Sequence, residues 1–364
     1  MSGRSIILLS FFTYGGFVFA RAPVSDTVMT VNESPGKTFV ALPALGYTPE
    51  TRFFGGLVGS LIWGSEKPSL KSSVTALMIY SQNHQVQAGV SYEIFLTRGA
   101  FRITGETYYL RWPDKFYGIG NSTPASAEEA YSERLVRSVN GVFHEVAPHL
   151  SLGLEYELRS GRIVEMSEKG LLAAKQVVGV NPYFASGLGV TMIYDTRDDN
   201  FVPLKGLYFI AGGRWFTRAL GSDFVFTRYT LDGRAYLQIG DEHVMAMNVY
   251  LGGVSDGAPF QMLWLAGGES RGRGYYFGRY RDNVLMSSQV EYRSPLVWRV
   301  GFVVFGGVTE VGPALRGLST AGIHPFAGMG VRFRLLQSAR VNIRFDFGFG
   351  AASSASYIGI NEAF

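Results

Sequence analysis

The sequence has no cysteine among its 364 residues, and only 17% of the residues are charged. The absence of cysteine excludes disulfides and thiolate metal sites. Aromatic residues make up 14% of the chain, so it lacks the composition of a disordered protein. Long apolar runs are also missing, because even residues 5–20 fall short of the roughly 18 residues that a membrane-spanning helix needs. Since 47% of the residues are hydrophobic, the apolar residues must be spread along the whole chain.

The N-terminal residues 1–20 have the three parts of a secretory signal peptide. Arg4 supplies the positive charge, residues 6–18 form the apolar part, and Ala20 ends a small-residue cleavage pattern. A membrane anchor and a buried N-terminal strand are the alternatives. We expect export with a cleaved signal peptide, followed by a short periplasmic N-terminal segment at 21–37.

Apolar and polar residues alternate along much of the remaining chain, which is the period of a strand with two different faces. In residues 341–350 the apolar positions are Val341, Ile343, Phe345, Phe347 and Phe349. Clear and weaker versions of this pattern predict sixteen strands and no helix between residues 38 and 364. The expected strands are 38–49, 54–64, 71–81, 85–96, 99–111, 132–146, 150–159, 185–196, 206–219, 223–238, 241–252, 283–293, 296–309, 327–335, 341–350 and 353–364.

Strand length and spacing favour a membrane barrel over a soluble sandwich. Strands of about ten residues suit a bilayer, whereas soluble strands average about five or six. Short connections alternate with the long gaps 112–131, 160–184, 253–282 and 310–324, as in outer-membrane barrels. Since lipid-facing arginine costs about 2–4 kcal/mol at the midplane, the polar faces must line the interior. The sequence therefore predicts an all-β, sixteen-stranded antiparallel transmembrane β-barrel at 38–364, integral to a Gram-negative outer membrane.

One stretch, residues 265–282, is not explained by barrel physics. It is rich in glycine and arginine and lies between two long predicted strands. Arginines crowded in this way would find acidic partners most readily by folding into the lumen. The alternative is a flexible glycine-rich surface loop.

This stretch resembles the sixth extracellular loop of the BamA/TamA superfamily of outer-membrane assembly factors, the bacterial surface antigen domain. The likeness rests on the triplet Arg273, Gly274 and Tyr275, on the preceding Gly267 and Gly268, and on the position between the eleventh and twelfth predicted strands. The resemblance implies that this long extracellular loop packs back inside the barrel.

The resemblance also implies an acidic partner for Arg273, and Glu291 is the matching position. Such charge-assisted pairs avoid an unpaired charge in a tight lumen. The family often has a second acid on the next strand, where this sequence has Gly306 and Gly307, with Glu310 beyond.

A second match is a turn in the middle of the chain. It comprises Asp195, Arg197, Asp198, Pro203 and Gly206, which are similar to the family's motif at a mid-barrel turn. The acidic residues of this turn could bind a cation, but acid-rich turns usually bind none.

The end of the sequence resembles the terminal signal that the outer-membrane insertion machinery reads. Gly359 and the final aromatic Phe364 match that signal, whereas Glu362 stands where a hydrophobic residue is usual. The resemblance implies that this protein is itself a client of that machinery.

Assembly factors of this family carry periplasmic POTRA domains before the barrel. Residues 21–37 are too few for any domain, so we expect a stand-alone form without POTRA domains. A periplasmic or membrane protein partner would then take the place of those domains.

Catalytic and nucleotide-binding patterns are missing from the sequence. The five histidines are His84, His144, His149, His243 and His324, and no two of them have metal-ligand spacing on a helix. No nucleophile elbow or phosphate loop is present. Basic residues are scattered singly although the net charge is +4, which argues against nucleic acid. We expect no enzyme, no cofactor and no metal; a Ser/His site assembled across strands stays open.

Three functions are compatible with such a barrel in contact with outer-membrane lipid. The first is assistance in inserting or translocating protein or lipid through a weak seam between the first and last strands. Gly348, Gly350 and residues 351–355 are consistent with poor closure there, although glycine also suits a crowded barrel wall. The alternatives are a passive outer-membrane pore and a scaffold that anchors a periplasmic or surface partner.

Overall fold

The computed structural model describes residues 30–34, 37–48, 52–64, 71–97, 100–199, 202–336, 341–360 and 362–364. The expected signal peptide, residues 1–20, lies outside these described residues. Within the described ranges, no helix is long and apolar enough to cross a membrane.

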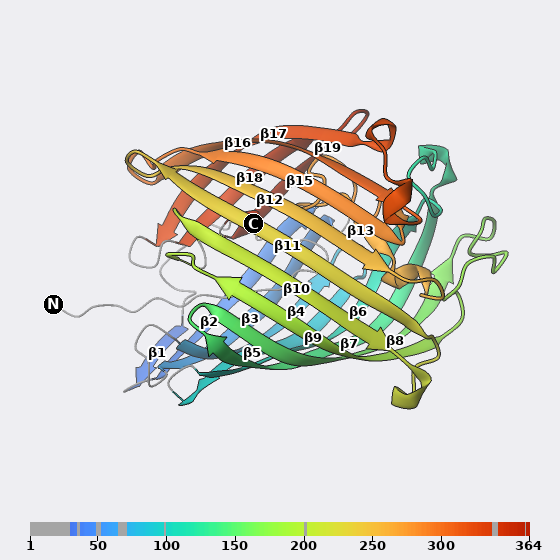
Figure 1. Cartoon of the computed structure of the whole chain (residues 1–364), viewed down its shortest axis with the longest axis horizontal. Coiled ribbons are helices and arrows are strands. Elements are labelled where there is room, and N and C mark those ends of the chain that lie inside the picture. Colours follow the sequence, from blue (N-terminus) through green and yellow to red (C-terminus); the bar gives the residue numbers. More distant parts are fainter. Residues whose placement is uncertain are drawn as a thin grey trace.

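Strands dominate the molecule and form one large curved sheet (Figure 1). Its first strands are β1 (Thr30–Ser34), β2 (Lys37–Thr48), β3 (Arg52–Gly64), β4 (Lys71–Ser81), β5 (Val86–Leu96), β6 (Phe101–Phe116), β7 (Glu129–Ala147), β8 (Leu150–Met166) and β9 (Tyr183–Asp195). Its later strands are β10 (Gly206–Phe216), β11 (Phe226–Ile239), β12 (His243–Val254), β15 (Val284–Arg293), β16 (Val300–Gly312), β17 (His324–Leu336), β18 (Val341–Phe349) and β19 (Ser354–Ile360).

Short elements occupy the connections. Strands β13 (Trp264–Ala266) and β14 (Tyr280–Asp282) form a separate two-stranded sheet that packs against β15 and β16. The 3-10 helices are η2 (Ala125–Ala127), η3 (Arg218–Leu220), η4 (Phe260–Met262), η5 (Leu315–Gly317) and η6 (Thr320–Gly322). The long connections gather at one end of the sheet, on the right in Figure 1. We call this the loop end, and the opposite end the turn end.

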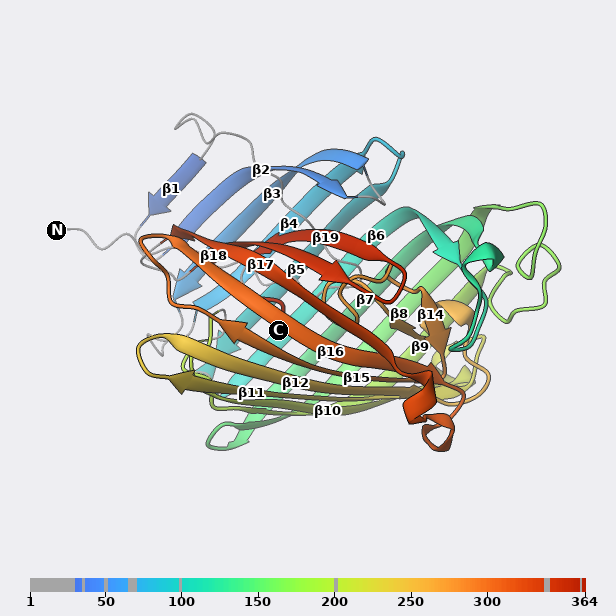
Figure 2. The ribbon, with the colours of Figure 1, turned by 90° about the horizontal axis from the view of Figure 1, so that it is seen from above.

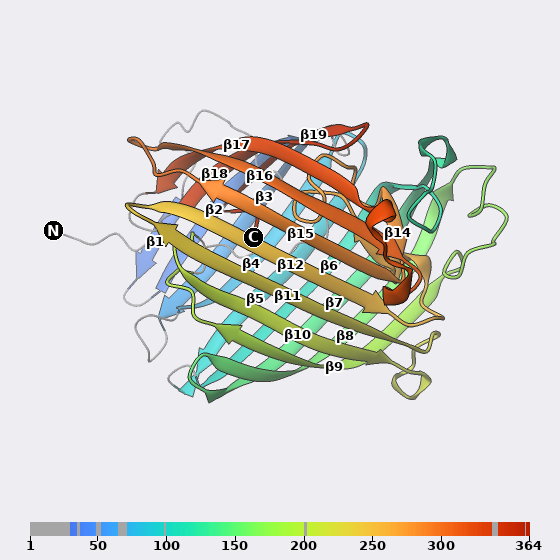
Figure 3. The ribbon, with the colours of Figure 1, turned by 45° about the horizontal axis from the view of Figure 1, so that its top comes forward.

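Each strand of the large sheet pairs antiparallel with its neighbour in sequence, and β12 pairs with β15. The sheet curls around a common interior, as the two turned views show (Figure 2 and Figure 3). Registers among the described residues run from β1 to β19, and none of them joins β19 to β1 or β2. In the described part of the chain, the sheet is therefore continuous but not closed.

The strand count corrects the prediction of sixteen. The sheet has seventeen strands, because β1 pairs with β2 from Thr30 opposite Ala41 to Ser34 opposite Lys37. The sequence had placed these residues in the segment 21–37, where five residues are too short for a recognisable period of two. The other strands, β2–β12 and β15–β19, correspond one by one to the sixteen predicted strands.

The alternation separates an apolar outer face from a polar inner face. Large hydrophobic side chains are exposed on the outer face of the strands: Leu57, Met78, Val90, Val142, Leu154, Val190, Leu207, Leu237, Val249, Phe302, Val304, Met329, Val331, Phe347 and Phe349. On the inner face Glu157 is fully buried between Arg137 and Arg214. Such an exposed apolar band around a charged, paired interior is typical of a membrane barrel.

An apolar cluster fills the interior at the loop end. Phe116 of β6 and Phe260 of η4 meet edge to face at 5.2 Å, and Tyr250 meets Trp264 of β13 at 5.5 Å. These aromatic contacts anchor the β12–β15 connection to the inner wall.

Candidate functional site

The glycine- and arginine-rich stretch folds against the concave face of the sheet. Its central part, Gly267–Gly278, links β13 to β14, and we call it the triplet segment. It folds back on itself, because the Gly267 amide donates to the Arg271 carbonyl at 2.9 Å and the Gly268 amide to Tyr275 at 2.9 Å. Gly267 has a φ of 105°, and a Cβ there would lie 2.0 Å from the Tyr276 carbonyl oxygen. The double glycine therefore makes this tight reversal possible.

Arg273 lies at the centre of a buried network of ion pairs. Its side chain is fully buried, and Nη1 donates to Glu291 of β15 at 2.6 Å. Nη2 donates to Gln289 at 3.0 Å, and the guanidinium lies 3.4 Å from the centre of the Phe305 ring. The structure thus brings together Arg273 and Glu291, the pair that the resemblance implied.

The second acid near Arg273 is Asp346 of β18, at 3.2 Å from Nη1. The resemblance had pointed to the strand after the one that carries Glu291, where this sequence has Gly306 and Gly307, with Glu310 beyond. Glu310 instead accepts a hydrogen bond from the Ser319 amide at 2.9 Å. Sequence reasoning missed Asp346, although the alternation placed it on a polar face. Only the curvature of the sheet brings β18 close to β15.

Further arginines complete this network. Arg293 donates to Glu291 at 2.9 Å, and Arg332 donates to Asp346 at 2.5 Å. Arg344 contacts both Asp346, at 3.1 Å, and Glu269 of the triplet segment. Burial raises the pKa of the Glu269 carboxyl, and Arg344 opposes that shift.

This arrangement has an energetic consequence. Each buried charge depends on several charged partners. Removal of one partner should therefore destabilise the folded chain by about 3–5 kcal/mol, because it leaves a buried charge uncompensated.

Gly274 and Tyr275 contact the last hairpin, which we define as β18, β19 and the connection 350–353. The Gly274 amide donates to the Tyr357 hydroxyl at 3.0 Å, and Ser353 donates to the Gly274 carbonyl at 2.8 Å. The Tyr275 hydroxyl donates to the Pro325 carbonyl at 2.9 Å and accepts from the Ala351 amide at 2.9 Å. The triplet therefore joins β19 and the connection of this hairpin to β17.

Glycine allows this backbone approach. Gly274 has a φ of 114°, and a Cβ there would lie 2.6 Å from Gly350 N. A Cβ at Gly348 would lie 2.6 Å from the Arg273 carbonyl carbon. These glycines of β18 and its turn thus have a direct packing role under the triplet.

The mid-chain turn is held by its own acidic residues at the turn end of the sheet. Arg197 forms a two-point pair with Asp195, at 2.9 and 2.7 Å, and stacks 3.9 Å from the centre of the Tyr208 ring. Asp198 accepts hydrogen bonds from the amides of Leu204 and Lys205 at 2.9 and 3.1 Å. The Asp195 carboxylate therefore fixes the Arg197 side chain, and the Asp198 carboxylate satisfies backbone amides of the turn.

The remaining positions of this motif shape the same turn. Pro203 immediately precedes the amides that Asp198 binds, and Gly206 opens β10 with a φ of 115°. Among the described residues, no group of three His, Asp or Glu side chains could hold a metal ion.

The end of the sequence lies against the interior. Gly359 of β19 pairs with Arg344 of β18, and Phe364 is buried. Glu362 accepts a hydrogen bond from Arg332 at 2.6 Å. Glu362, which stands where the family signal has a hydrophobic residue, is therefore part of the interior ion network.

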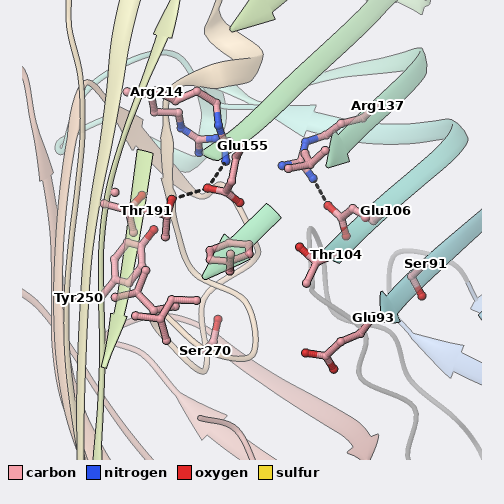
Figure 4. Close-up of a pocket in the computed structure, with 18 of the residues that line it drawn as sticks. Ser91, Glu93, Thr104, Glu106, Arg137, Glu155, Thr191, Arg214, Tyr250 and Ser270 are labelled. Atoms are coloured by element: carbon pink, nitrogen blue, oxygen red, sulfur yellow. Dashed lines mark hydrogen bonds and ion pairs between the residues drawn. The ribbon is translucent and has the colours of Figure 1, made fainter. Parts of the chain in front are cut away.

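A cavity of about 380 Å³ lies between the triplet segment and strands β4 to β12. Figure 4 shows charged residues of β6, β7, β8 and β10 around it, with Glu106 paired to Arg137 and Glu155 paired to Arg214. Ser270 of the triplet segment also lines it. The interior is thus partly filled by paired charges and by the triplet segment.

A curved antiparallel sheet with an apolar outer face and an ion-paired interior defines an integral outer-membrane β-protein of the barrel type. The model of the Omp85 superfamily domain matches residues 80–361. The chain belongs to the Omp85 superfamily. This membership indicates a Gram-negative outer membrane and a general role in protein translocation or assembly there.

Solved structures of this fold agree with the family. BamA from Haemophilus ducreyi lacking POTRA domains 1–3 is 13% identical, with a TM-score of 0.62 over 92% of this chain and 74% of that chain. CdiB from Acinetobacter baumannii is 10% identical, with a TM-score of 0.56 over 89% of this chain and 59% of that chain. CdiB from Escherichia coli is 11% identical, with a TM-score of 0.58 over 91% and 62%. No curated protein sequence matches significantly.

Proposed function

We propose that this protein assists the insertion or translocation of protein or lipid at the outer membrane, through a seam between β19 and the first strands. The observation that carries this proposal is the contact of the triplet with the last hairpin. Arg273 holds the triplet to β15, and Gly274 hydrogen-bonds to Tyr357 of β19. The triplet is thus placed to set how firmly β19 is held beside the seam.

The weak pairing of β19 supports this role. Its register with β18 comprises only the seven pairs from Ile343 opposite Ile360 to Phe349 opposite Ser354. The register of β6 with β7, in contrast, extends from Phe101 opposite His144 to Phe116 opposite Glu129. Among the described residues β19 has a register with β18 alone. A strand with few ladder bonds and an unpaired edge is the one most easily separated or extended by another strand.

A passive pore and an anchoring scaffold are the alternative functions. The triplet segment and the paired charges inside the sheet weigh against a wide, permanently open pore. A scaffold would need a periplasmic or surface partner, and isolation of the native complex in mild detergent would identify it. We also propose that the outer-membrane insertion machinery assembles this protein and that no enzymatic activity is involved.

Crosslinking the seam tests the proposed function. The chain has no cysteine, so introduced cysteines are its only thiols. The seam pair has one cysteine in β2 and one among Ser354–Tyr357 of β19. The matched control is Ser60→Cys with Thr75→Cys, which lie directly opposite each other on β3 and β4.

The readout is the composition of outer-membrane proteins and surface lipids in cells that depend on each variant. We expect oxidation of the seam pair to abolish function, reduction to restore it, and the control pair to have no effect. Full function with a completely crosslinked seam would refute the proposal.

A further inference from the structure

The last residues of the sequence, Glu362–Phe364, reach a wall of the sheet far from their own strand. They follow β19, whereas Phe364 packs against Tyr236 of β11 and against Val244 and Ala246 of β12. Strands β15 to β18 lie between these two places in the order of pairing. The chain therefore crosses the concave face at the turn end, and the C-terminal mark lies within the outline of the sheet in each ribbon view (Figure 1, Figure 2 and Figure 3).

Specific polar contacts hold this tail segment. Arg293 donates to the backbone oxygen of Phe364 at 3.0 Å, and its guanidinium lies 5.4 Å from the centre of the Phe364 ring. Glu362 accepts from Arg332 at 2.6 Å and from Asn342 at 2.9 Å. The Glu362 side chain is only 3% exposed, so these contacts are made away from bulk water.

The same two arginines also serve the acid that binds the triplet. Glu291 lies 2.9 Å from Arg293 and 3.6 Å from Arg332, and it accepts from Arg273 at 2.6 Å. When Arg273 is withdrawn, Glu291 loses its closest positive partner and draws Arg293 and Arg332 toward itself. Glu362 then competes for these two arginines and is held less firmly.

We propose that Glu362–Phe364 is an internal latch at the turn end of the interior, and that docking of Arg273 holds the latch closed. The triplet segment, which enters from the loop end, and the tail segment are coupled through Arg293, Arg332 and Glu291. Release of one favours release of the other. The latch belongs to the interior alone and does not require the seam to open.

Cysteine labelling of the full chain in lipid vesicles tests the latch. Ala363→Cys places one thiol in the tail segment, and Asp241→Cys places one in the exposed β11–β12 turn at the same end. The labelling rate with a soluble maleimide is measured for each thiol, first in the otherwise unchanged chain and then with Arg273→Ala, Gln289→Ala or Glu362→Gln. Arg137→Ala is the matched control, because it breaks a buried ion pair with Glu157 on another wall.

We expect the thiol of Ala363→Cys to react at least about tenfold more slowly than that of Asp241→Cys. Addition of Arg273→Ala or Glu362→Gln should raise the labelling rate of the Ala363→Cys thiol about tenfold, because each change leaves a buried charge of the network without a partner. Gln289→Ala removes only one acceptor of Arg273 and provides the test of coupling if Arg273→Ala does not fold. Arg137→Ala should leave the rate unchanged. Equal rates at the two positions would overturn the latch. The coupling between the triplet segment and the tail segment would be overturned by either of two results. One is a labelling rate of the Ala363→Cys thiol that neither Arg273→Ala nor Gln289→Ala changes, and the other is a rate that Arg137→Ala raises equally.

Discussion

At the scale of single residues, Arg273 organises the interior because it satisfies two acids from different strands. Glu291 belongs to β15 and Asp346 to β18, and both are almost inaccessible to water. Two such carboxylates would repel each other without the guanidinium between them. An arginine suits this position better than a lysine, because its planar group donates to several acceptors at once.

Gly274 provides a test at the residue scale. Gly274→Ala should destabilise the folded chain by about 2–4 kcal/mol, since it combines a strained positive φ with a collision against the last hairpin. The free energy of unfolding is measured by denaturant titration in lipid.

Gly120→Ala is the matched control, because Gly120 has a similar φ of 123° but no atom within 4 Å of the added Cβ. It should cost only about 1–2 kcal/mol. Equal losses for the two variants would show that close packing under the triplet contributes nothing.

At the scale of elements, the last hairpin depends on contacts from outside the ladder. β19 has one described neighbour, β18, and receives additional hydrogen bonds from the triplet through Tyr357 and Ser353. A neutral hydrogen bond contributes about 1 kcal/mol, so each of these contacts matters for a short edge strand.

Tyr357→Phe tests this dependence. Loss of the hydroxyl that Gly274 binds should speed hydrogen exchange of the β19 amides about fivefold, with little change in the amides of β4 and β5. Tyr292→Phe is the control, because it removes the hydroxyl that contacts His243 at 2.6 Å, away from the last hairpin. If exchange in β19 is the same in both variants, the triplet does not support this strand.

The elements also show what the sequence could reveal. Alternation predicted β2–β12 and β15–β19, because each long strand carries its own period of two. It could not reveal β1, which has only five residues.

The sequence also did not reveal two contacts across the interior. These are the ion pair of Arg273 with Asp346 and the packing of Phe364 against Tyr236. Both contacts join strands that are distant in the order of pairing, so they depend on how the whole sheet curves. A period of two assigns a side chain to a face of the sheet, but it does not select its partner across the interior.

At the scale of the whole molecule, two segments occupy the interior from opposite ends. The triplet segment enters from the loop end and contacts the last hairpin, and Glu362–Phe364 enters at the turn end. Their shared ion network joins the triplet segment to β15, β17 and Glu362. The hydrogen bond from Gly274 to Tyr357 connects the triplet to β19. We infer from these contacts that the docked triplet restrains the last hairpin beside the seam.

A distance measurement between paired spin labels tests this restraint of the last hairpin. Labels on Leu57→Cys in β3 and Ser356→Cys in β19 report the separation across the seam in lipid, and both positions are exposed. With Arg273 present we predict one narrow distance distribution, and with Arg273→Ala a broad one that extends to longer distances. Arg137→Ala should keep the narrow distribution. A distribution that stays equally narrow in correctly folded Arg273→Ala would show that the docked triplet does not restrain the last hairpin.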